Sequence, residues 1–286
     1  MTKVLVLGAG GMAGHVIATH LSELNYDVTT LSANNKLDNK TILLDVTDFK
    51  SLSTFLDRNT FDIIINGIGV LVKKSEERKD IASLLNAYLP HFLENYCKNL
   101  HTRVIHLSTD CVFSGEHAPY TEQSSYDGKL FYDQSKALGE IINESDLTFR
   151  MSIIGPDMNK EGVGLFNWFF HQTGNIEGYK KALWNGITTI ELAKGIDAAI
   201  KQNLTGLYHL VPERNISKFD LINEFIKAFN RDDINLLPSE KPMPNKTLVN
   251  TRKDFNYTVK DYPDMIKEMK EWIDARPHLY PNYGKK

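Results

Sequence analysis

Short aliphatic runs alternate with longer amphipathic stretches through the first half of the chain. The runs occupy residues 3–7, 26–31, 41–44, 61–65, 103–107 and 147–153. Runs of this length are typical of strands that are buried on both faces. Because the stretches between them carry apolar residues at helical spacing, the alternation predicts βαβ units and an α/β fold built on a doubly wound parallel sheet.

Helices are expected in the intervening stretches and again toward the C-terminus. Their expected bounds are 12–24, 48–56, 81–99, 130–143, 189–201, 217–230 and 261–275. Pro90 predicts a kink or a break in the third of them. The charge-dense segment 72–80 is expected to be a solvated loop, and a further strand is expected at 206–211. Segment 236–249 holds three of the ten prolines and is expected to be irregular.

Three glycines, Gly8, Gly11 and Gly14, stand directly between the first strand and the first helix. At such a junction Gly8 makes the tight turn, Gly11 lets a phosphate approach the backbone, and Gly14 allows close packing of the helix on the sheet. The free N–H groups and the positive end of the helix dipole then favour a pyrophosphate. The alternative is a turn that serves packing only. We interpret the motif as the dinucleotide site of a Rossmann-type domain.

The end of the second strand bears on the choice of dinucleotide. NAD-preferring sites usually carry Asp or Glu there to bond the ribose 2′-hydroxyl, whereas this chain has Leu31 and Ser32, followed by Lys36. Without a carboxylate to repel a 2′-phosphate, NADPH is the expected cofactor. NADH stays open, because no arginine is present there to hold that phosphate.

The alternation of strand and helix patterns loosens beyond Gly155 and Pro156. We therefore expect an NAD(P)-binding Rossmann domain over residues 1–153. Residues 154–286 are expected to form mainly a smaller C-terminal α/β lobe that binds the substrate, with some of its segments free to return to the first domain.

Composition narrows the partners and the compartment. The 286 residues carry a net charge of −3 with no long basic run, which argues against nucleic acid and anionic membranes as partners. The two cysteines, Cys97 and Cys111, form neither a disulfide framework nor a zinc-binding spacing, and no metal site is expected. There is no signal-peptide pattern and no apolar run of about 20 residues, so a cytoplasmic protein is expected.

Tyr132 and Lys136 are four residues apart in an expected helix, so their side chains share one face. An ammonium beside a phenol favours the phenolate and lowers the phenol pKa from its usual value of about 10, which makes proton transfer feasible near neutral pH. Thr109 follows the strand at 103–107 and could hold a carbonyl oxygen beside that phenol. The alternative is a surface tyrosine and a solvated lysine. The order of these motifs along the chain favours a catalytic site.

Several segments taken together resemble one family. They are LSTDCVFSG (107–115), FYDQSKALGE (131–140), RMSIIG (150–155), WNGITTIELA (184–193) and GLYHL (206–210). In this order they are similar to motifs of the extended short-chain dehydrogenase/reductases, and within them of the dTDP-4-dehydrorhamnose reductase family. The resemblance covers nearly the whole chain. It implies NAD(P)H-dependent reduction of the C4 ketone of a nucleotide-linked 4-keto-6-deoxyhexose to a deoxy-L-sugar nucleotide.

The resemblance also implies roles for particular residues. Thr109 would polarise the ketone, Tyr132 would donate the proton, and Lys136 would lower the phenol pKa and bond the nicotinamide ribose. The residues implied in cofactor binding, besides Tyr132 and Lys136, are Gly8, Gly11, Met12 and Gly14 at the pyrophosphate, Ser32 at the end of strand two, Asp45 and Val46 at the adenine, Asn66, Gly67 and Ile68 at the ribose, and Ser108 at the nicotinamide end. Those implied in substrate binding are Thr109, Asp110, Val112, Tyr132, Asn167 and Trp184. Asp110 could instead brace its loop, and Trp184 could instead belong to the core.

Three positions depart from the family pattern. Cys111 stands where tyrosine is usual, Asp133 replaces the glycine after Tyr132, and Ile187 stands where proline is common. We expect these positions to lie near the sugar or its lid, which favours a UDP-linked 2-acetamido-4-keto-6-deoxyhexose over dTDP-4-dehydrorhamnose. The magnesium site and the dimer of the family do not carry over, because no matching acidic motif is present. A monomer or a homodimer is expected.

Two other functions stay open. A sugar-nucleotide epimerase or dehydratase would use tightly held NAD. Dehydratases of that kind usually carry a Glu next to the Asp that follows the active-site threonine, where this chain has Cys111. The other alternative is a non-catalytic subunit similar to the regulatory subunit of methionine adenosyltransferase. The presence of Thr109, Tyr132 and Lys136 argues against it.

Overall fold

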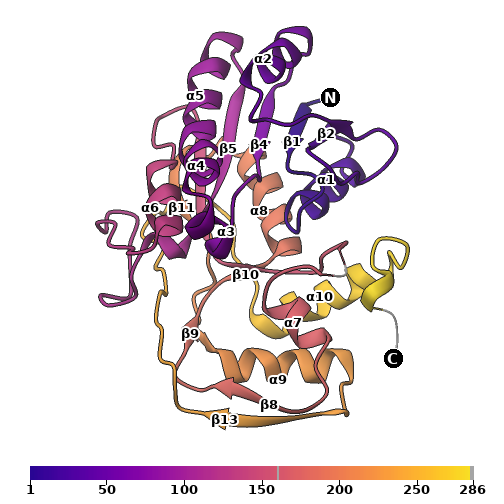
Figure 1. Cartoon of the computed structure of the whole chain (residues 1–286), viewed down its shortest axis with the longest axis vertical. Helices are drawn as coiled ribbons and strands as arrows, with labels where there is room; N and C mark the ends of the chain where they lie inside the picture. The colour runs from indigo at the N-terminus through magenta and orange to yellow at the C-terminus, as the bar shows by residue number, and fades with distance from the viewer. Residues whose placement is uncertain (160, 284–286) are drawn as a thin grey trace.

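A computed structural model describes residues 1–159 and 161–283. Its centre is a parallel sheet of seven strands in the order β11-β6-β5-β4-β1-β2-β3. The strands are β1 (Lys3–Leu7), β2 (Asp27–Ser32), β3 (Ile42–Leu43), β4 (Ile63–Asn66), β5 (Arg103–Thr109), β6 (Leu147–Met151) and β11 (Gly206–His209). Figure 1 shows this sheet in the upper part of the molecule. The predicted α/β fold with a parallel sheet is confirmed.

Helices follow the strands along the chain, as the alternating pattern predicts. Those of the first part are α1 (Gly14–Glu23), α2 (Phe49–Arg58), α3 (Val72–Glu77), α4 (Lys79–Ala82), the π-helical η1 (Ser83–Tyr88), α5 (Leu89–Leu100), the short 3₁₀ turn η2 (Asp110–Val112) and α6 (Phe131–Leu138). Those of the rest are α7 (Leu165–Phe170), α8 (Thr189–Lys201), α9 (Lys218–Phe229), α10 (Tyr262–Asp274) and the 3₁₀ turn η3 (Pro281–Tyr283).

Helices cover both faces of the sheet, and β1 shows why its sequence is apolar throughout. Val4 and Val6 pack in one core with residues of α1 and α8. Leu5 and Leu7 pack in a second core with residues of α2 and α5. Because successive side chains of a strand point to opposite faces, a strand between two helical layers has no position for a solvated residue.

The strand order reverses between β1 and β4, because the chain builds outward first through β2 and β3 and then through β5, β6 and β11. A hydrogen bond from the Gly67 N–H to the Leu7 carbonyl oxygen (3.1 Å) holds the carboxyl ends of β1 and β4 together there. In open parallel sheets a ligand binds in the crevice at such a point. A ligand site is therefore expected at the loops that follow Leu7 and Asn66.

Short strands and the helices α7, α9 and α10 form the lower part of the molecule in Figure 1. Its strands are β7 (Ile153–Ile154), β8 (Gly174–Tyr179), β9 (Leu183–Trp184), β10 (Ile187–Thr188), β12 (Ile216–Ser217) and β13 (Ile234–Ser239), which pair as β7–β10, β8–β13 and β9–β12. Phe166 on α7 and Phe225 on α9 share one core with the α1 side of the sheet. α8 packs on α1, and β11 joins the central sheet. The expected division at residue 153 stays a prediction.

The segment 72–80 is helical, so the expectation of a loop is wrong. α3 and α4 cover most of it, and its charged side chains are exposed. Ser75 is fully buried and donates to the Val70 carbonyl oxygen (2.8 Å), and α3 packs against α6. A small polar residue, rather than an apolar repeat, faces the protein here, and the charge pattern therefore concealed the helix.

Elsewhere the expected elements form with altered bounds. The helix around Pro90 breaks into α4, η1 and α5, with Pro90 in the first turn of α5, as predicted. α6 is shorter than expected, and the run 147–153 divides into β6 and β7. The expectation for 236–249 is wrong at its start, because β13 extends to Ser239.

Gly14→Ala is expected to destabilise the protein by about 1–3 kcal/mol, the usual cost of overpacking a filled site. A β-carbon at Gly14 would lie 2.2 Å from the Gly8 carbonyl oxygen, so α1 would have to move off the sheet. At Gly11 the nearest atom to a β-carbon is the same oxygen at 3.3 Å, so Gly11→Ala is the matched control and should lose less. Urea unfolding measures the difference. Wild-type stability of Gly14→Ala would contradict the packing role.

Candidate active site

The three residues expected in catalysis meet at the carboxyl end of β5. Thr109 is the last residue of β5, and Tyr132 and Lys136 lie on α6. Their exposures are only 9%, 8% and 4%. The Tyr132 hydroxyl shares a hydrogen bond with the Thr109 side chain, and Lys136 Nζ donates to the Leu107 carbonyl oxygen (2.7 Å). The packing of α6 on β5 brings the three side chains together.

Burial governs the ionisation of this site. It raises the pKa of the Tyr132 phenol, and the hydrogen bond with Thr109 offsets that rise only in part. Burial also lowers the pKa of Lys136 to about 8, although the charge of Glu140 opposes the shift. The pKa of Tyr132 is therefore raised overall, and the expected net lowering is wrong. The phenol is protonated, which is the form that a proton donor requires.

Lys136 is linked to two buried polar residues, His106 and Asn66. No sequence motif indicated His106. His106 on β5 lies with Nε2 3.3 Å from Lys136 Nζ and with Nδ1 3.2 Å from Asn66 Nδ2. Asn66 is fully buried, and its Oδ1 accepts from the Ile68 N–H (3.2 Å). The Asn66 side chain therefore bonds within the protein, and the expectation that Asn66 lines the cofactor ribose stays a prediction. A histidine within an aliphatic strand is the signal that points to such a network, because a buried polar group needs a partner.

The glycine turn has the form that a dinucleotide requires. Gly8 adopts φ +82°, and its N–H donates to the Leu31 carbonyl oxygen (2.9 Å). A β-carbon at Gly11 would meet only the Gly8 oxygen within 4 Å, so the space in front of it is open. The N–H groups of Met12 and Ala13 donate to no acceptor within the described residues. Free backbone donors before the first turn of α1 fit a pyrophosphate.

Other residues expected near the cofactor lie around the same crevice. Ser32 ends β2, and its hydroxyl oxygen lies 2.8 Å from where a β-carbon of Gly10 would stand. The loop after β2 thus packs closely on the glycine turn. Gly67 and Ile68 are partly exposed after β4, and their contact with a cofactor stays a prediction.

Asp45 and Val46, which are expected at the adenine, both make contacts within the protein. The Asp45 carboxylate accepts from the N–H (2.9 Å) and from the hydroxyl (2.8 Å) of Thr47. Val46 is 4% exposed and packs in the α2 core. Their role at the adenine stays a prediction.

A buried ion pair lies beneath the end of β5. Arg150 on β6 donates from Nε (2.9 Å) and Nη2 (2.6 Å) to the two carboxylate oxygens of Glu140, and neither side chain is exposed. The hydroxyls of Ser108 and Tyr126 donate to the same carboxylate at 2.5 and 2.8 Å. The Ser108 hydroxyl therefore holds the strand end in place, and the expectation that Ser108 lies at the nicotinamide end stays a prediction.

Two of the three departures from the family pattern are structural. The Asp133 carboxylate accepts from the Leu130 N–H (3.2 Å) and caps the start of α6. Ile187 is fully buried in β10, which pairs with β7. Both residues thus have structural roles, and Asp133 also raises the pKa of Tyr132. The expectation that the two positions lie near the sugar or its lid stays a prediction. Electrostatic interaction with Cys111 raises the pKa of Tyr132. Burial raises the pKa of the Cys111 thiol to about 12.

The charges of Lys218 and Lys246 lower the pKa of Asp110, and no sequence motif indicated either lysine. The Asp110 carboxylate accepts from the Thr109 hydroxyl (3.1 Å), and burial raises its pKa although the charges of Lys218 and Lys246 oppose the rise. Lys218 Nζ lies 4.4 Å from the centre of the Trp184 ring, and burial lowers its pKa to about 8. Both lysines are far from Asp110 in sequence, so no local spacing could have associated them.

Three further residues expected at the substrate belong to the framework. Val112 is fully buried in a small core around η2. The Asn167 amide oxygen accepts from the Tyr283 hydroxyl (2.8 Å) in the interior. Trp184 is 5% exposed and donates from its indole N–H to the Ser152 hydroxyl (2.8 Å). The substrate contacts expected of Val112 and Asn167 stay predictions, and for Trp184 burial favours the alternative of a core residue.

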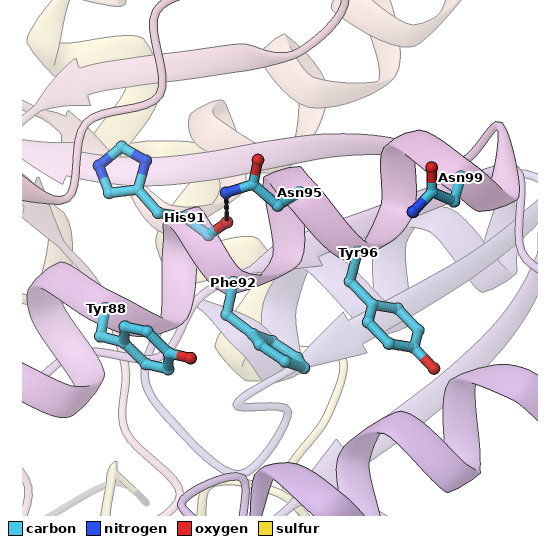
Figure 2. A pocket seen from close by; sticks show the side chains of 6 residues that line it. All are labelled: Tyr88, His91, Phe92, Asn95, Tyr96 and Asn99. Atoms are coloured by element: carbon cyan, nitrogen blue, oxygen red, sulfur yellow. Dashed lines mark hydrogen bonds between the residues drawn. The ribbon is translucent and has the colours of Figure 1, made fainter.

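A shallow groove on the surface of η1 and α5 is separate from this site. Its lining residues are Tyr88, His91, Phe92, Asn95, Tyr96 and Asn99. Figure 2 shows them along one helical stretch, with the Asn95 amide donating to the His91 carbonyl oxygen (2.9 Å). None of the candidate catalytic residues lines the groove, so it takes no part in the chemistry at the end of β5.

The side chains of residues 1–159 and 161–283 form no metal centre of their own. No group of three or more His, Cys, Asp or Glu side chains in that part of the chain could hold a metal ion. No helix in it combines the length and the apolar character that crossing a membrane requires. Cys97 and Cys111 are free thiols.

Comparison with known proteins assigns this arrangement to a family. Residues 1–253 match the family model described as the RmlD substrate binding domain. The chain belongs to this family. The motif-based resemblance to the extended short-chain reductases of the dTDP-4-dehydrorhamnose type is thereby confirmed.

The individual proteins that the chain resembles are distant from it in sequence. The spore coat polysaccharide biosynthesis protein SpsK of Bacillus subtilis is 31% identical over 142 residues, which are 49% of this chain and 47% of that protein. A dTDP-4-keto-6-deoxy-D-glucose reductase of Streptomyces niveus is 23% identical over 97% of this chain and 96% of that protein. The crystal structure of a Bacillus anthracis dTDP-4-dehydrorhamnose reductase in complex with NADP has a TM-score of 0.82 at 19% identity, covering 95% of this chain and 100% of that one. This last similarity shows the shared fold.

Arg150→Met is expected to cost about 3–5 kcal/mol of unfolding free energy, because it leaves the Glu140 carboxylate buried without its charge partner. The double variant Arg150→Met, Glu140→Leu removes both charges and should recover most of that loss. Urea unfolding followed by circular dichroism measures both variants. If the single variant proved as stable as the double one, the ion pair would not hold the end of β5.

Proposed function

We propose that the protein reduces the C4 ketone of a nucleotide-linked 4-keto-6-deoxyhexose with NADPH and so forms a deoxy-L-sugar nucleotide. The meeting of Thr109, Tyr132 and Lys136 at the carboxyl end of β5, in a chain of this family, carries the proposal. The Streptomyces niveus relative is a reductase of such a ketone, which supports the same substrate class.

The side chains of the site divide the chemistry among them. We assign Thr109 to the ketone oxygen, beside Tyr132. The Tyr132 phenol, kept protonated by burial, donates the proton that the new C4 hydroxyl requires. We assign Lys136, fixed on the Leu107 carbonyl oxygen, to the nicotinamide ribose.

The glycine turn is assigned to the cofactor pyrophosphate. Open space at Gly11 and the free N–H of Met12 fit an anion at the start of α1. Bound NADPH supplies the hydride. Since β2 ends in Ser32 rather than in an acidic residue, NADPH is preferred and NADH stays possible. The Bacillus anthracis relative in complex with NADP supports that preference.

Two sugars fit the proposed reaction, dTDP-4-dehydrorhamnose and a UDP-2-acetamido-4-keto-6-deoxyhexose. Of the departures that favoured the acetamido sugar, Asp133 and Ile187 are explained by the fold. Both Cys111 and Asp133 raise the pKa of Tyr132, so two of the three departures lie close to the proposed proton donor and still support the acetamido sugar. Steady-state rates with both ketones decide between them.

The same assay separates the alternatives. NADPH oxidation on addition of the ketone supports a reductase, product without net oxidation would identify an epimerase, and binding without turnover would identify a regulatory subunit. A dehydratase is disfavoured because Cys111 follows Asp110. A regulatory subunit is disfavoured because it has no need of a buried Thr109–Tyr132–Lys136 arrangement.

We propose the cytoplasm as the compartment, because Cys97 and Cys111 are free thiols of the kind that a reducing environment preserves. A monomer or a homodimer stays the prediction for the assembly. Sedimentation equilibrium distinguishes the two.

Tyr132→Phe is expected to lower kcat by about 10²–10⁴-fold, the usual size of a general-acid contribution, while NADPH still binds. Tyr88→Phe, which removes the hydroxyl of an exposed tyrosine on η1, is the matched control and should keep full activity. Loss of NADPH absorbance gives the rates, and NADPH fluorescence titration gives the affinity. Unchanged turnover in Tyr132→Phe would remove Tyr132 from the mechanism.

Lys218→Met is expected to raise the KM of the nucleotide sugar by about 10-fold with little change in kcat, the size expected for a lost contact to a charged group. The charges of Lys218 and Lys246 both lower the pKa of Asp110. We therefore assign these two lysines to binding of the substrate diphosphate. Lys227→Met removes an exposed lysine from the same helix and is the control. An equal KM in the Lys218 and Lys227 variants would contradict the assignment.

A further inference from the structure

A chain of buried hydrogen bonds ends at Lys136. It runs from the Ile68 N–H to Asn66 Oδ1 (3.2 Å), from Asn66 Nδ2 to His106 Nδ1 (3.2 Å), and from His106 Nε2 to Lys136 Nζ (3.3 Å). Asn66 and His106 are fully buried. The chain joins the end of β4 to α6 through β5, and the proposed roles of Thr109 and Tyr132 make no use of it.

The first link fixes the orientation of the Asn66 amide. Its Oδ1 faces the Ile68 N–H, which is a donor only, so the oxygen accepts there. The Nδ2 group then faces His106 Nδ1 and donates to it. Since Nδ1 acts as an acceptor, it carries no proton.

Burial fixes the charge of the His106 ring. It lowers the pKa of His106 well below the usual value and is the largest cause of that shift. A neutral imidazole carries one proton. With Nδ1 occupied as an acceptor, that proton resides on Nε2, the atom that faces Lys136.

The last link discriminates between the two forms of Lys136. An ammonium group has only donors, whereas a neutral amine has a lone pair that can accept. An Nε2–H directed at Nζ therefore favours the amine, and the amine still donates to the Leu107 carbonyl oxygen. We propose that Asn66 and His106 are positioning residues that bias Lys136 toward the neutral amine.

The other groups around α6 leave this bias in place. The charge of Glu140 raises the pKa of Lys136, while burial is the larger cause and lowers it to about 8. The charged side chains of α3 and α4 are exposed, and Glu76 among them accepts from the Tyr132 N–H (3.2 Å). On η2, Cys111 and Asp110 raise the pKa of Tyr132. Tyr88 on η1 is exposed to solvent.

The test measures the ionisation of Lys136 directly and needs no turnover. Protein labelled with 13C at the lysine ε-carbon is titrated by NMR, and Lys136→Met assigns the signal. Asn66→Asp offers His106 Nδ1 an acceptor and so reverses the tautomer. His106→Gln offers Nζ an amide oxygen. We expect a wild-type midpoint at or below about 8 and a rise of about one unit or more in both variants.

A matched control uses the other histidine of this region. His91→Gln changes a partly exposed histidine on α5 and should leave the midpoint unchanged. Unchanged midpoints in Asn66→Asp and His106→Gln, or a rise of the same size in His91→Gln, would overturn the proposal.

A second measurement does not depend on whether a variant folds. The 15N spectrum of the His106 ring in the wild-type protein reports its tautomer. A proton on Nε2 supports the proposal, and a proton on Nδ1 overturns it. The inference rests on the proposed function only in treating Lys136 as part of the site. A ring protonated on Nε2 in a protein that reduces no ketone would refute the proposed function alone, and a ring protonated on Nδ1 in an active reductase would refute this inference alone.

Discussion

The polar contact between α6 and β5 is the interaction on which the candidate site depends. Lys136 on α6 meets His106 and a backbone carbonyl of β5, and Glu140 just beyond α6 meets Ser108. Buried charges and polar groups are expensive to leave unpaired. The helix therefore cannot slide or rotate on the strand without breaking several of these bonds. This restriction fixes Tyr132 beside the end of β5.

The same burial decides the electrostatics of the site. In water, an ammonium would lower the pKa of a neighbouring phenol, and the resulting phenolate would raise the pKa of the ammonium. Here burial dominates, and it raises the pKa of Tyr132 and lowers that of Lys136. Both shifts favour the neutral forms. The site is accordingly organised around a protonated phenol and a lysine whose pKa burial lowers to about 8.

The return of the chain to the central sheet explains how the lower part of the molecule reaches the site. β11 pairs with β6 at one edge of the sheet, and the chain then passes through β12 into α9. Lys218 is the first residue of α9, where its charge acts on Asp110. One continuous core joins α7 and α9 to the α1 side of the sheet. The lower part therefore contributes positive charge to a site whose reacting groups come from the first part.

The sequence by itself determined the parallel sheet, the glycine turn and the shared helix face of Tyr132 and Lys136, because each depends on local periodicity or spacing. A motif does not determine which way a side chain points within the fold. Four residues that were matched by motif are buried in the fold, namely Asn66, Ser108, Val112 and Asn167. Only the tertiary structure brought His106 and Lys218 to the site and set the direction of the pKa shifts. Burial and contacts between distant segments arise when the layers pack, and no local pattern in the chain records them.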